Sequence, residues 1–382
     1  MKLLNAHIYL LPAAVAVSGA YAEVCLGQSG ALAFGLESGI RHTDNVTLSS
    51  DEESDTVISL LPTLNYRSDA GAASIDAVIG VESLTYSELD SNDAENFKSS
   101  IRVAFPDERE GENFSFVFEG GYNETTSARS SLQSVVQTEE TDLALKTRYY
   151  INDYTTLRTS VEHADSVSQT ENFADVTTLT IPVALYLELD EALSAGIGYR
   201  YRSTELGKIT SDRADSTDQA FYFGLENERS SVWGYALEIG IQSRDFDQNV
   251  DFGDESGLFA SLAASWQLSA MTELVAEIGN EYGTTLANQS TETSGIALQL
   301  NHSYDDRLSA SFGLSVEQIE YVQENGSTRE DDRFSSYVNV DYKLKDEKWY
   351  LRASVSYDDN SSDFARANYS ALSTGISSVF LY

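Results

Sequence analysis

The chain is short of several residue types, and each shortage excludes a class of protein. Its 382 residues include one cysteine, four prolines and four histidines. The single cysteine, Cys25, excludes an intrachain disulfide, and the residues before it match a lipid-attachment motif poorly. We expect it to be a free thiol in an N-terminal tail. Only 24 residues are basic against 61 acidic ones, a formal net charge of −37. Because phosphate binding needs a basic face, we exclude a nucleic-acid partner.

Signatures of catalysis are also missing. The sequence has no G-x-S-x-G, H-E-x-x-H or P-loop motif, and His42, His163 and His302 have no evident nucleophile beside them. The acidic loop from Asp245 to Asp251 spaces its carboxylates as a calcium loop does, but it lacks glycine at the sixth position and glutamate at the twelfth. We therefore expect no enzyme activity, no cofactor and no specific metal site.

Long apolar runs are absent after the N-terminus. Lys2, the apolar run from Ile8 to Val17 and the A-x-A site Ala20-Tyr21-Ala22 have the order of a signal peptide. We predict a signal peptide at residues 1–22 and a single mature domain at residues 23–382. In that domain no apolar run reaches the roughly 18 residues that a membrane-spanning helix needs.

What the chain has in abundance is alternation. In VALYLELDEALSAGIGYRYR, residues 183–202, apolar side chains stand at every second position on both sides of the turn Asp190-Glu191-Ala192. A period of two predicts a β-hairpin with one apolar and one polar face. The unit recurs along the chain to give about 18 strands, with short and long connections in strict alternation. The predicted strands include 114–123, 141–150 and 219–226, so that residues 124–140 form a long loop.

An even number of strands puts both termini at the end with the short turns, as in a bacterial outer-membrane barrel. There the apolar faces meet lipid, whereas in a soluble β-sandwich or propeller they form a core. The signal peptide and the aromatic final strand, with Phe380 and Tyr382, favour the barrel, because barrel-assembly machinery reads such a strand. We predict an all-β, transmembrane, antiparallel up-and-down barrel with short periplasmic turns and longer acidic extracellular loops. We place it in the outer membrane of a Gram-negative bacterium.

The strand register predicts which side chains face the lumen. The predicted pore-lining residues are Arg67, Lys98, Arg102, Lys146, Arg148, Arg158, Glu162, Tyr186, Glu188, Arg200, Arg202, Glu238, Arg244, Glu277, Arg333, Tyr337 and Arg352. Basic and acidic lumen positions balance in this register. The lumen should therefore be nearly neutral, and the net negative charge should lie in loops and turns such as DEESD and SELDSNDAE.

Two roles compete for the lumen side chains. Arginine and glutamate on adjacent strands can pair and stiffen the wall, or a basic stripe can attract anions. The basic stripe comprises Lys146, Arg148, Arg158, Arg200 and Arg202. Tyrosines on the same face can stack on sugars or can simply pack against the wall; they are Tyr86, Tyr150, Tyr186, Tyr222, Tyr337 and Tyr350.

The segment FGLESGIRHTDNVTLS and the three predicted strands after it, up to Phe105, resemble the putative β-barrel porin type 2 family. The residues that carry the resemblance are Asp44-Asn45-Val46, Pro62 and the junction from Tyr86 to Asn96-Phe97. Members of the family include outer-membrane proteins encoded in exopolysaccharide operons, and the family brings no catalytic residues. The resemblance implies export of an extracellular polysaccharide across the outer membrane, together with a periplasmic polysaccharide-export protein.

We therefore expect a polysaccharide-export channel whose partners are the polysaccharide chain, the periplasmic export protein, barrel-assembly machinery, and outer-membrane lipid and lipopolysaccharide. A general or solute-specific diffusion porin is the first alternative. A plugged barrel whose acidic loops serve adhesion or another surface interaction is the second. A conductance recording separates an open barrel from a plugged one.

Overall fold

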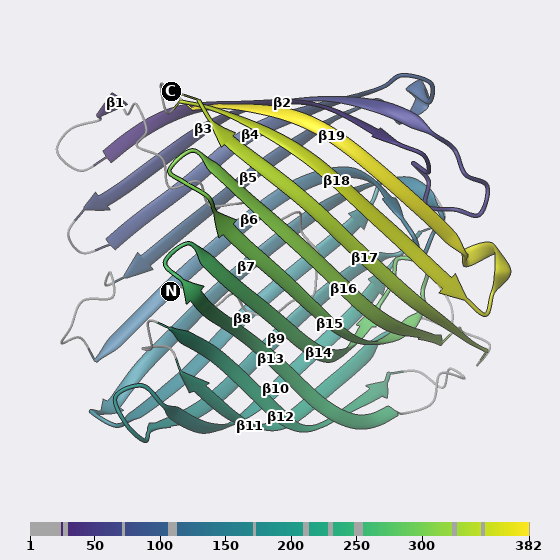
Figure 1. Ribbon diagram of the computed structural model, residues 1–382. Coiled ribbons are helices and arrows are strands. Elements are labelled where there is room, and N and C mark those ends of the chain that lie inside the picture. The colour runs from purple at the N-terminus through teal and green to yellow at the C-terminus, as the bar shows by residue number, and fades with distance from the viewer. Residues whose placement is uncertain are drawn as a thin grey trace.

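Antiparallel pairing passes from strand to strand round a complete circle (Figure 1). Among the described residues, eighteen strands form the wall, and the last strand pairs with the first. They are β2 (Gly30–Thr43), β3 (Asp55–Ala70), β4 (Ala73–Tyr86), β5 (Ala94–Phe105), β6 (Phe114–Arg129), β7 (Ser134–Asn152), β8 (Thr155–Ser168), β9 (Asp175–Glu188), β10 (Ser194–Gly207), β11 (Ser216–Asn227), β12 (Trp233–Phe246), β13 (Glu255–Ser269), β14 (Thr272–Thr284), β15 (Ser290–Ser303), β16 (Leu308–Val322), β17 (Thr328–Lys343), β18 (Trp349–Ser362) and β19 (Tyr369–Leu381). The predicted up-and-down barrel is confirmed.

The structure is a computed structural model that describes residues 24–25, 30–70, 73–105, 113–170, 173–208, 214–227, 232–247, 255–322, 327–344 and 348–381. The predicted signal peptide and most of the acidic loop that resembles a calcium loop lie outside this part. Two short 3-10 turns, η1 (Asp90–Asn92) and η2 (Ala365–Ala367), stand in connections between strands. No helix in the described part of the chain is long and apolar enough to cross a membrane.

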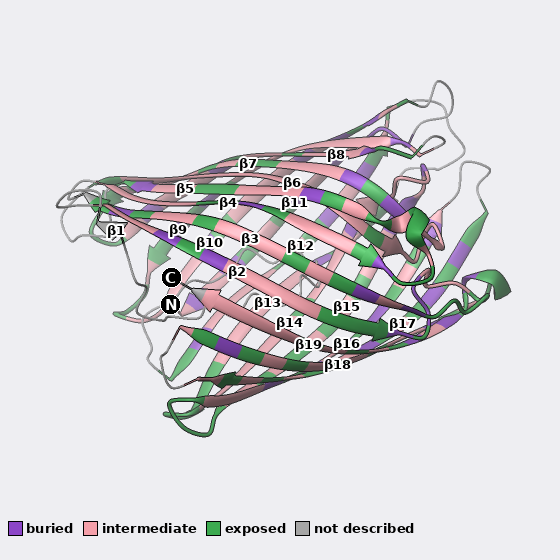
Figure 2. Cartoon of the chain, turned by 90° about the horizontal axis from the view of Figure 1, so that it is seen from above, coloured by how far each residue is buried: buried purple, intermediate pink, exposed green. Residues whose placement is uncertain are grey.

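The apolar face of the wall points outward. In β9 and β10 the register pairs Leu185 with Ile197, and these side chains are 37% and 68% exposed. On the alternate face, Arg158 of β8 bonds to Glu226 of β11, and strands that are not neighbours can meet in this way only through the interior. Apolar side chains therefore cover the outside and polar side chains face the lumen, as in an outer-membrane barrel. Figure 2 shows the wall as mainly exposed and intermediate residues.

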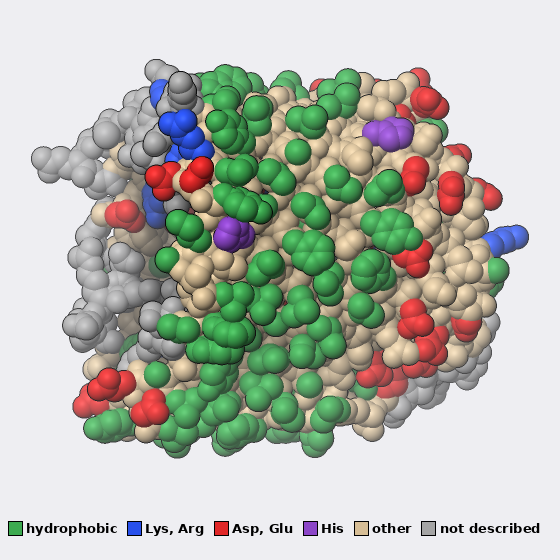
Figure 3. Space-filling view, viewed as in Figure 1, with side chains coloured by type: hydrophobic (Ala, Val, Ile, Leu, Met, Phe, Trp, Pro, Cys, Tyr) green, Lys and Arg blue, Asp and Glu red, His purple; other side chains and the backbone are tan. Residues whose placement is uncertain are grey.

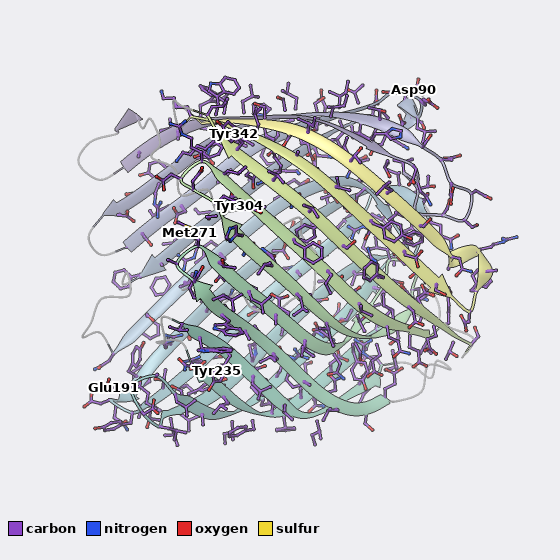
Figure 4. All side chains as sticks on the ribbon, viewed as in Figure 1. Asp90, Glu191, Tyr235, Met271, Tyr304 and Tyr342 are labelled. Carbon is purple, nitrogen blue, oxygen red and sulfur yellow. The ribbon has the colours of Figure 1, made fainter. Side chains whose placement is uncertain are left out.

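The two ends of the barrel differ in composition. Glu191, Met271, Tyr304 and Tyr342 lie at the end with the short turns, the turn end, whereas Asp90 lies at the opposite loop end (Figure 4). Aromatic pairs stand on the outside near the turn end: the stacked rings of Trp233 and Trp266 are 4.3 Å apart, and the tilted rings of Trp349 and Phe380 are 4.5 Å apart. Such rings suit a membrane interface. Figure 3 shows apolar side chains across the middle of the visible face and acidic ones gathered at the loop end.

Several strands continue further toward the loop end than predicted. Strand β6 runs to Arg129 and β7 starts at Ser134, so the long loop predicted at 124–140 is mostly paired strand. The sequence there loses its apolar alternation, but continued pairing still satisfies the backbone hydrogen-bonding groups beyond the bilayer. The expected N-terminal tail is also corrected, because Cys25 lies in the short strand β1 (Val24–Cys25), opposite Ala31 of β2.

The loop between β2 and β3 also contacts β19. The junction of β2 and β19, where the first and last strands of the wall pair and close the barrel, is called the seam. The Asp44 amide donates to the carbonyl of Leu372, and the Leu372 amide donates back to the Asp44 carboxylate, at 3.2 and 2.7 Å. The buried Asn45 side chain donates to the carbonyls of Ser370 and Ser49, at 3.0 and 2.8 Å. These contacts continue the pairing of the first and last strands past the point where the β-ladder ends.

Candidate channel interior

The strand pairings place every predicted pore-lining residue on the inward face. Each of these residues stands opposite an inward-facing partner, for example Arg67 opposite Asp76 and Tyr337 opposite Gly313. The same holds for the residues on the other strands: Lys98, Arg102, Lys146, Arg148, Arg158, Glu162, Tyr186, Glu188, Arg200, Arg202, Glu238, Arg244, Glu277, Arg333 and Arg352. That they line a conducting path stays a prediction.

In one part of the wall, the ion pairs among the described residues lie within a strand or join adjacent strands. This part, β16–β19 followed by β2–β7, is called the ladder half. Lys146 and Glu119 are 2.7 Å apart, and Arg352 and Asp341 are also 2.7 Å apart. The Arg67 side chain is 60% exposed in its pair with Asp76, so water reaches this pair, whereas the pair within β17 is buried. The predicted pairing along the wall is present here, and each such solvated pair is worth only about 0–1 kcal/mol.

The rest of the wall, β8–β15, carries ion pairs that cross the lumen and is called the bridged half. Arg158 of β8 makes a two-pronged contact with Glu226 of β11, with Nη1 and Oε2 2.6 Å apart. Its guanidinium also lies 4.4 Å from the centre of the Tyr186 ring on β9. The Glu226 side chain is only 7% exposed. Side chains from β8, β9 and β11 thus fill the space between their strands.

A second, deeper network lies nearer the loop end. Asp218 of β11 accepts bonds from Arg202 Nε at 2.7 Å and from Arg244 Nε at 2.6 Å. Arg202 continues across the lumen to Glu281 of β14, with Nη1 2.5 Å from Oε1. Arg244 is completely buried. Burying such charges is costly unless each is paired and hydrogen-bonded, so breaking the network should cost about 3–5 kcal/mol.

The predicted basic stripe is neutralised in the structure. Lys146 pairs with Glu119, Arg158 with Glu226, and Arg202 with Asp218. Arg200 lies 3.8 Å from Glu281 and stacks over Phe259 at 4.6 Å. Of the two roles considered for these residues, the contacts favour pairing, and attraction of anions stays a prediction. Glu119 and Asp218 come from adjacent strands, whereas Glu226 and Glu281 come from strands that the linear sequence does not place beside the arginines.

The lumen is also more acidic than predicted. The pairings add Glu37, Asp218, Glu226, Glu255, Asp331 and Asp358 to the acidic residues of the inward face, and Arg41, Arg129 and Arg329 to the basic ones. Several of these residues lie just outside the predicted strands. Asp218, for example, directly precedes the strand predicted at 219–226. The period of two continues through these positions and could have identified them. The near-neutral lumen is thus corrected to one with an excess of carboxylates.

Inward tyrosines of the bridged half lie against glycines. A Cβ atom added to Gly198 would overlap the Tyr222 ring, and one added to Gly224 would overlap Tyr186. On β16, Gly313 bears the same relation to Tyr337. Each glycine leaves room for a ring to lie along the wall. These contacts favour packing as the role of the three tyrosines, and stacking on sugars stays a prediction.

Compact sites for metals or ligands are not evident in the described residues. No group of three or more His, Cys, Asp or Glu side chains there could hold a metal ion. A cavity of about 80 Å³ opens near the turn end, between Arg148, Tyr150, Glu188 and Glu191. Small-molecule sites typically measure roughly 300–1,000 Å³. The feature available for function is therefore the lumen itself.

Comparison with known proteins agrees with this architecture. Residues 199–380 match the family described as Putative beta-barrel porin 2. This protein is a porin-like outer-membrane β-barrel. The match spans just under half of the chain, and the family resemblance is confirmed over that segment. Asp44-Asn45-Val46 and Pro62, which first indicated the resemblance, lie before the matched residues. The closed barrel and the match place the protein, called the porin hereafter, in the outer membrane of a Gram-negative bacterium.

Solved structures show the same fold at low identity. The porin resembles OccK2 (OpdF) of Pseudomonas aeruginosa, crystallised in complex with glucuronate, with 9% identity and a TM-score of 0.51 over 92% of this chain and 97% of that one. It also resembles the outer-membrane protein opdK of Pseudomonas aeruginosa, with 6% identity and a TM-score of 0.50 over 92% and 99% of the two chains. No curated protein matches the sequence.

Proposed function

We propose that this porin is a solute-selective diffusion channel for small hydrophilic molecules. The observation that carries the proposal is the bridged half of the lumen, where the Arg158–Glu226 and Arg202–Glu281 contacts span strands that are not neighbours. Side chains there occupy space that a bare barrel of 16–18 strands would leave as an aqueous channel. In the ladder half, pairs such as Arg67–Asp76 remain open to water. A narrowed, charge-lined path sorts solutes by size and charge.

The charge of the lumen indicates which solutes pass best. OccK2, which shares the fold, was crystallised with glucuronate, a sugar acid. In this porin the inward carboxylates outnumber the inward bases, and the arginines of the bridged half face carboxylates. A field of that sign favours neutral and cationic solutes over anions. Neutral sugars and small amines are therefore the cargo we propose.

Reconstitution of the purified porin tests this function. Planar-bilayer recordings measure conductance, and liposome swelling compares uptake of a neutral sugar, an amino sugar and a sugar acid of similar size. We expect steady conductance and slower uptake of the acid. A barrel that neither conducts nor swells liposomes contradicts the proposal and favours the plugged barrel with a surface role. Equal uptake of all three solutes would contradict the selectivity.

Export of an extracellular polysaccharide is the second candidate, and the resemblance of the N-terminal strands to the porin family is what supports it. In this function a periplasmic polysaccharide-export protein delivers the polymer to the turn end. The test is a deletion strain in which surface and periplasmic polymer are measured separately. Loss of surface polymer, restored by the wild-type copy, supports export, and unchanged surface polymer contradicts it.

A further inference from the structure

The barrel wall is split between β13 and β14 at the loop end. The two strands pair from the turn end only as far as Ala260 and Asn280. Both continue beyond this point, because β13 pairs with β12 up to Glu255 and β14 pairs with β15 up to Thr284. All of these residues lie in the described part of the chain. At the fork, the Asn280 side chain accepts from the Ala260 amide at 2.9 Å and donates to the Leu258 carbonyl at 2.5 Å.

Beyond the fork, β14 turns into the lumen. Tyr282 is four residues after the outward-facing Ile278, so the alternation along the strand would point its side chain outward as well. It is nevertheless only 2% exposed, and its ring lies 5.2 Å from the Arg244 guanidinium. The carbonyl of Tyr282, on the edge of β14 that faced β13, accepts from Arg202 instead. Arg244 Nη1 donates to the carbonyl of the next residue, Gly283, at 2.6 Å. Arg202 thus satisfies a backbone group that the split leaves without a strand partner, which would otherwise be costly.

The tip of this hairpin docks across the mouth of the barrel. The Ala174 amide, just before β9, donates to the Leu286 carbonyl at 2.8 Å. The Ala214 amide, just before β11, donates to the Asn288 side chain at 2.9 Å. Strands β9 and β11 are not neighbours of β14, so these contacts cross the lumen. Both alanines are fully buried, and with Leu206 they form an apolar cluster that Phe246 and Val322 flank.

These contacts give the hairpin two anchors. Arg202 and Arg244, held by Asp218, clamp its base, and the loops before β9 and β11 hold its tip. We propose that residues 281–293 of the β14–β15 hairpin form the constriction of this channel and set the largest solute that it passes. The inference rests on the proposed channel function. Cargo follows the ladder side of the hairpin, because docking of the hairpin occupies the bridged side.

Two variants release the hairpin at different points. Arg244→Gln removes the bond to Gly283 at the base, and Asn288→Ala removes the bond to Ala214 at the tip. Arg307→Gln is the matched control, because it removes an arginine from an exposed turn outside the lumen, between β15 and β16. We expect each release variant to raise unitary conductance roughly twofold and to admit larger maltodextrins in liposome swelling. The control should keep the wild-type conductance and size limit.

A disulfide tests the docking directly. In a Cys25→Ser background, the double substitution Ala174→Cys and Leu286→Cys should give a disulfide under oxidation. When Asn288→Ala is added to these substitutions, the oxidised protein should regain the wild-type size limit, and a reductant should remove it again. Failure of the cysteines to cross-link in a folded barrel would contradict the docked tip. If the wild type conducts and the folded release variants keep its conductance and size limit, the proposed constriction is contradicted but the channel function stands. If neither the wild type nor any variant conducts, both the constriction and the channel function are contradicted.

Discussion

Glycine on the inward face of this barrel makes room for tyrosine and for closely approaching backbone. At Gly240, an added Cβ atom would overlap the Phe221 carbonyl and the Tyr222 backbone. At Gly121, which also faces inward, the nearest atom to an added Cβ is the Ser99 carbonyl at 3.8 Å. The same residue type therefore stands in a closed site at one position and an open site at the other. Only the first position requires glycine for steric reasons.

We therefore expect Gly240→Ala to lower the free energy of unfolding by about 1–3 kcal/mol, because the new methyl group meets backbone that cannot move aside cheaply. Gly121→Ala is the matched control and should stay close to wild type. Urea unfolding in lipid vesicles, followed by tryptophan fluorescence, measures both. Equal stabilities of the two variants would contradict the steric argument.

A turn residue gives a pH dependence at the same scale. The amides of Arg307 and Leu308 both donate to Asp305 Oδ1 at 2.8 Å, and these bonds lower the pKa of the Asp305 carboxyl from its ordinary value. A lowered folded pKa means that the carboxylate stabilises the turn above the unfolded pKa, roughly 3.9. That contribution disappears as the pH falls through the folded pKa.

The carboxyl ¹³C titration of Asp305 in detergent micelles should therefore have a lower midpoint than in a short peptide of the same sequence. Identical midpoints for Asp305 in the protein and the peptide would mean that the two amide bonds do not hold the turn in solution.

At the scale of elements, strand identity follows from alternation but strand length does not. The apolar alternation marks only the part of each strand that crosses the membrane. Strands β6 and β7 are therefore several residues longer than the alternating segments that predicted them. The seam is a related case. Asp44-Asn45-Val46 reads as a polar loop start, yet it joins the first loop to β19. No local pattern indicates a contact with residues at the far end of the chain.

Asn45→Ala should loosen this seam. The side chain is 1% exposed and bonds to Ser49 and Ser370, so its loss leaves buried carbonyls without a donor, at about 1–3 kcal/mol. We expect unfolding in SDS at a lower temperature, seen as the heat-induced mobility shift on a gel. Asn65→Ala, which loses a single half-buried bond to Thr63, should shift the transition less. Equal shifts would contradict the proposed role of the seam contacts.

At the scale of the whole molecule, the lumen carries more carboxylates than bases. Glu277 of β14 faces inward, and in the described residues it has no ion-pair partner. An acidic lumen raises the local concentration of cations, and salt screens the effect because the Debye length is about 10 Å at 0.1 M. The porin should therefore select cations, most strongly in dilute salt.

Reversal potentials in a KCl gradient measure this selectivity. We expect a K⁺ preference that shrinks as salt is raised, and a smaller preference in Glu277→Gln. Asp306→Asn, an exposed turn position outside the lumen, is the control and should match wild type. An anion-selective wild type would contradict the charge assignment of the inward face.

The sequence alone determined the number of strands and, for most positions within the predicted strands, which side chains face lipid and which face inward. Those properties are local, because the two-residue period sets the face of a side chain within its own strand. The predicted register therefore agrees with the inward positions of residues as far apart as Arg67 and Arg352.

Only the tertiary structure decided which inward residues meet. The partners of Arg158 and Arg202 across the lumen, Glu226 and Glu281, depend on how the closed wall curves. The fork at Ala260 and Asn280 likewise has no signature in the alternation, since β13 and β14 keep their period beyond it. Curvature and closure arise from the pairing of all strands together, and they bring Arg158 and Arg202 to carboxylates on strands that are not their neighbours.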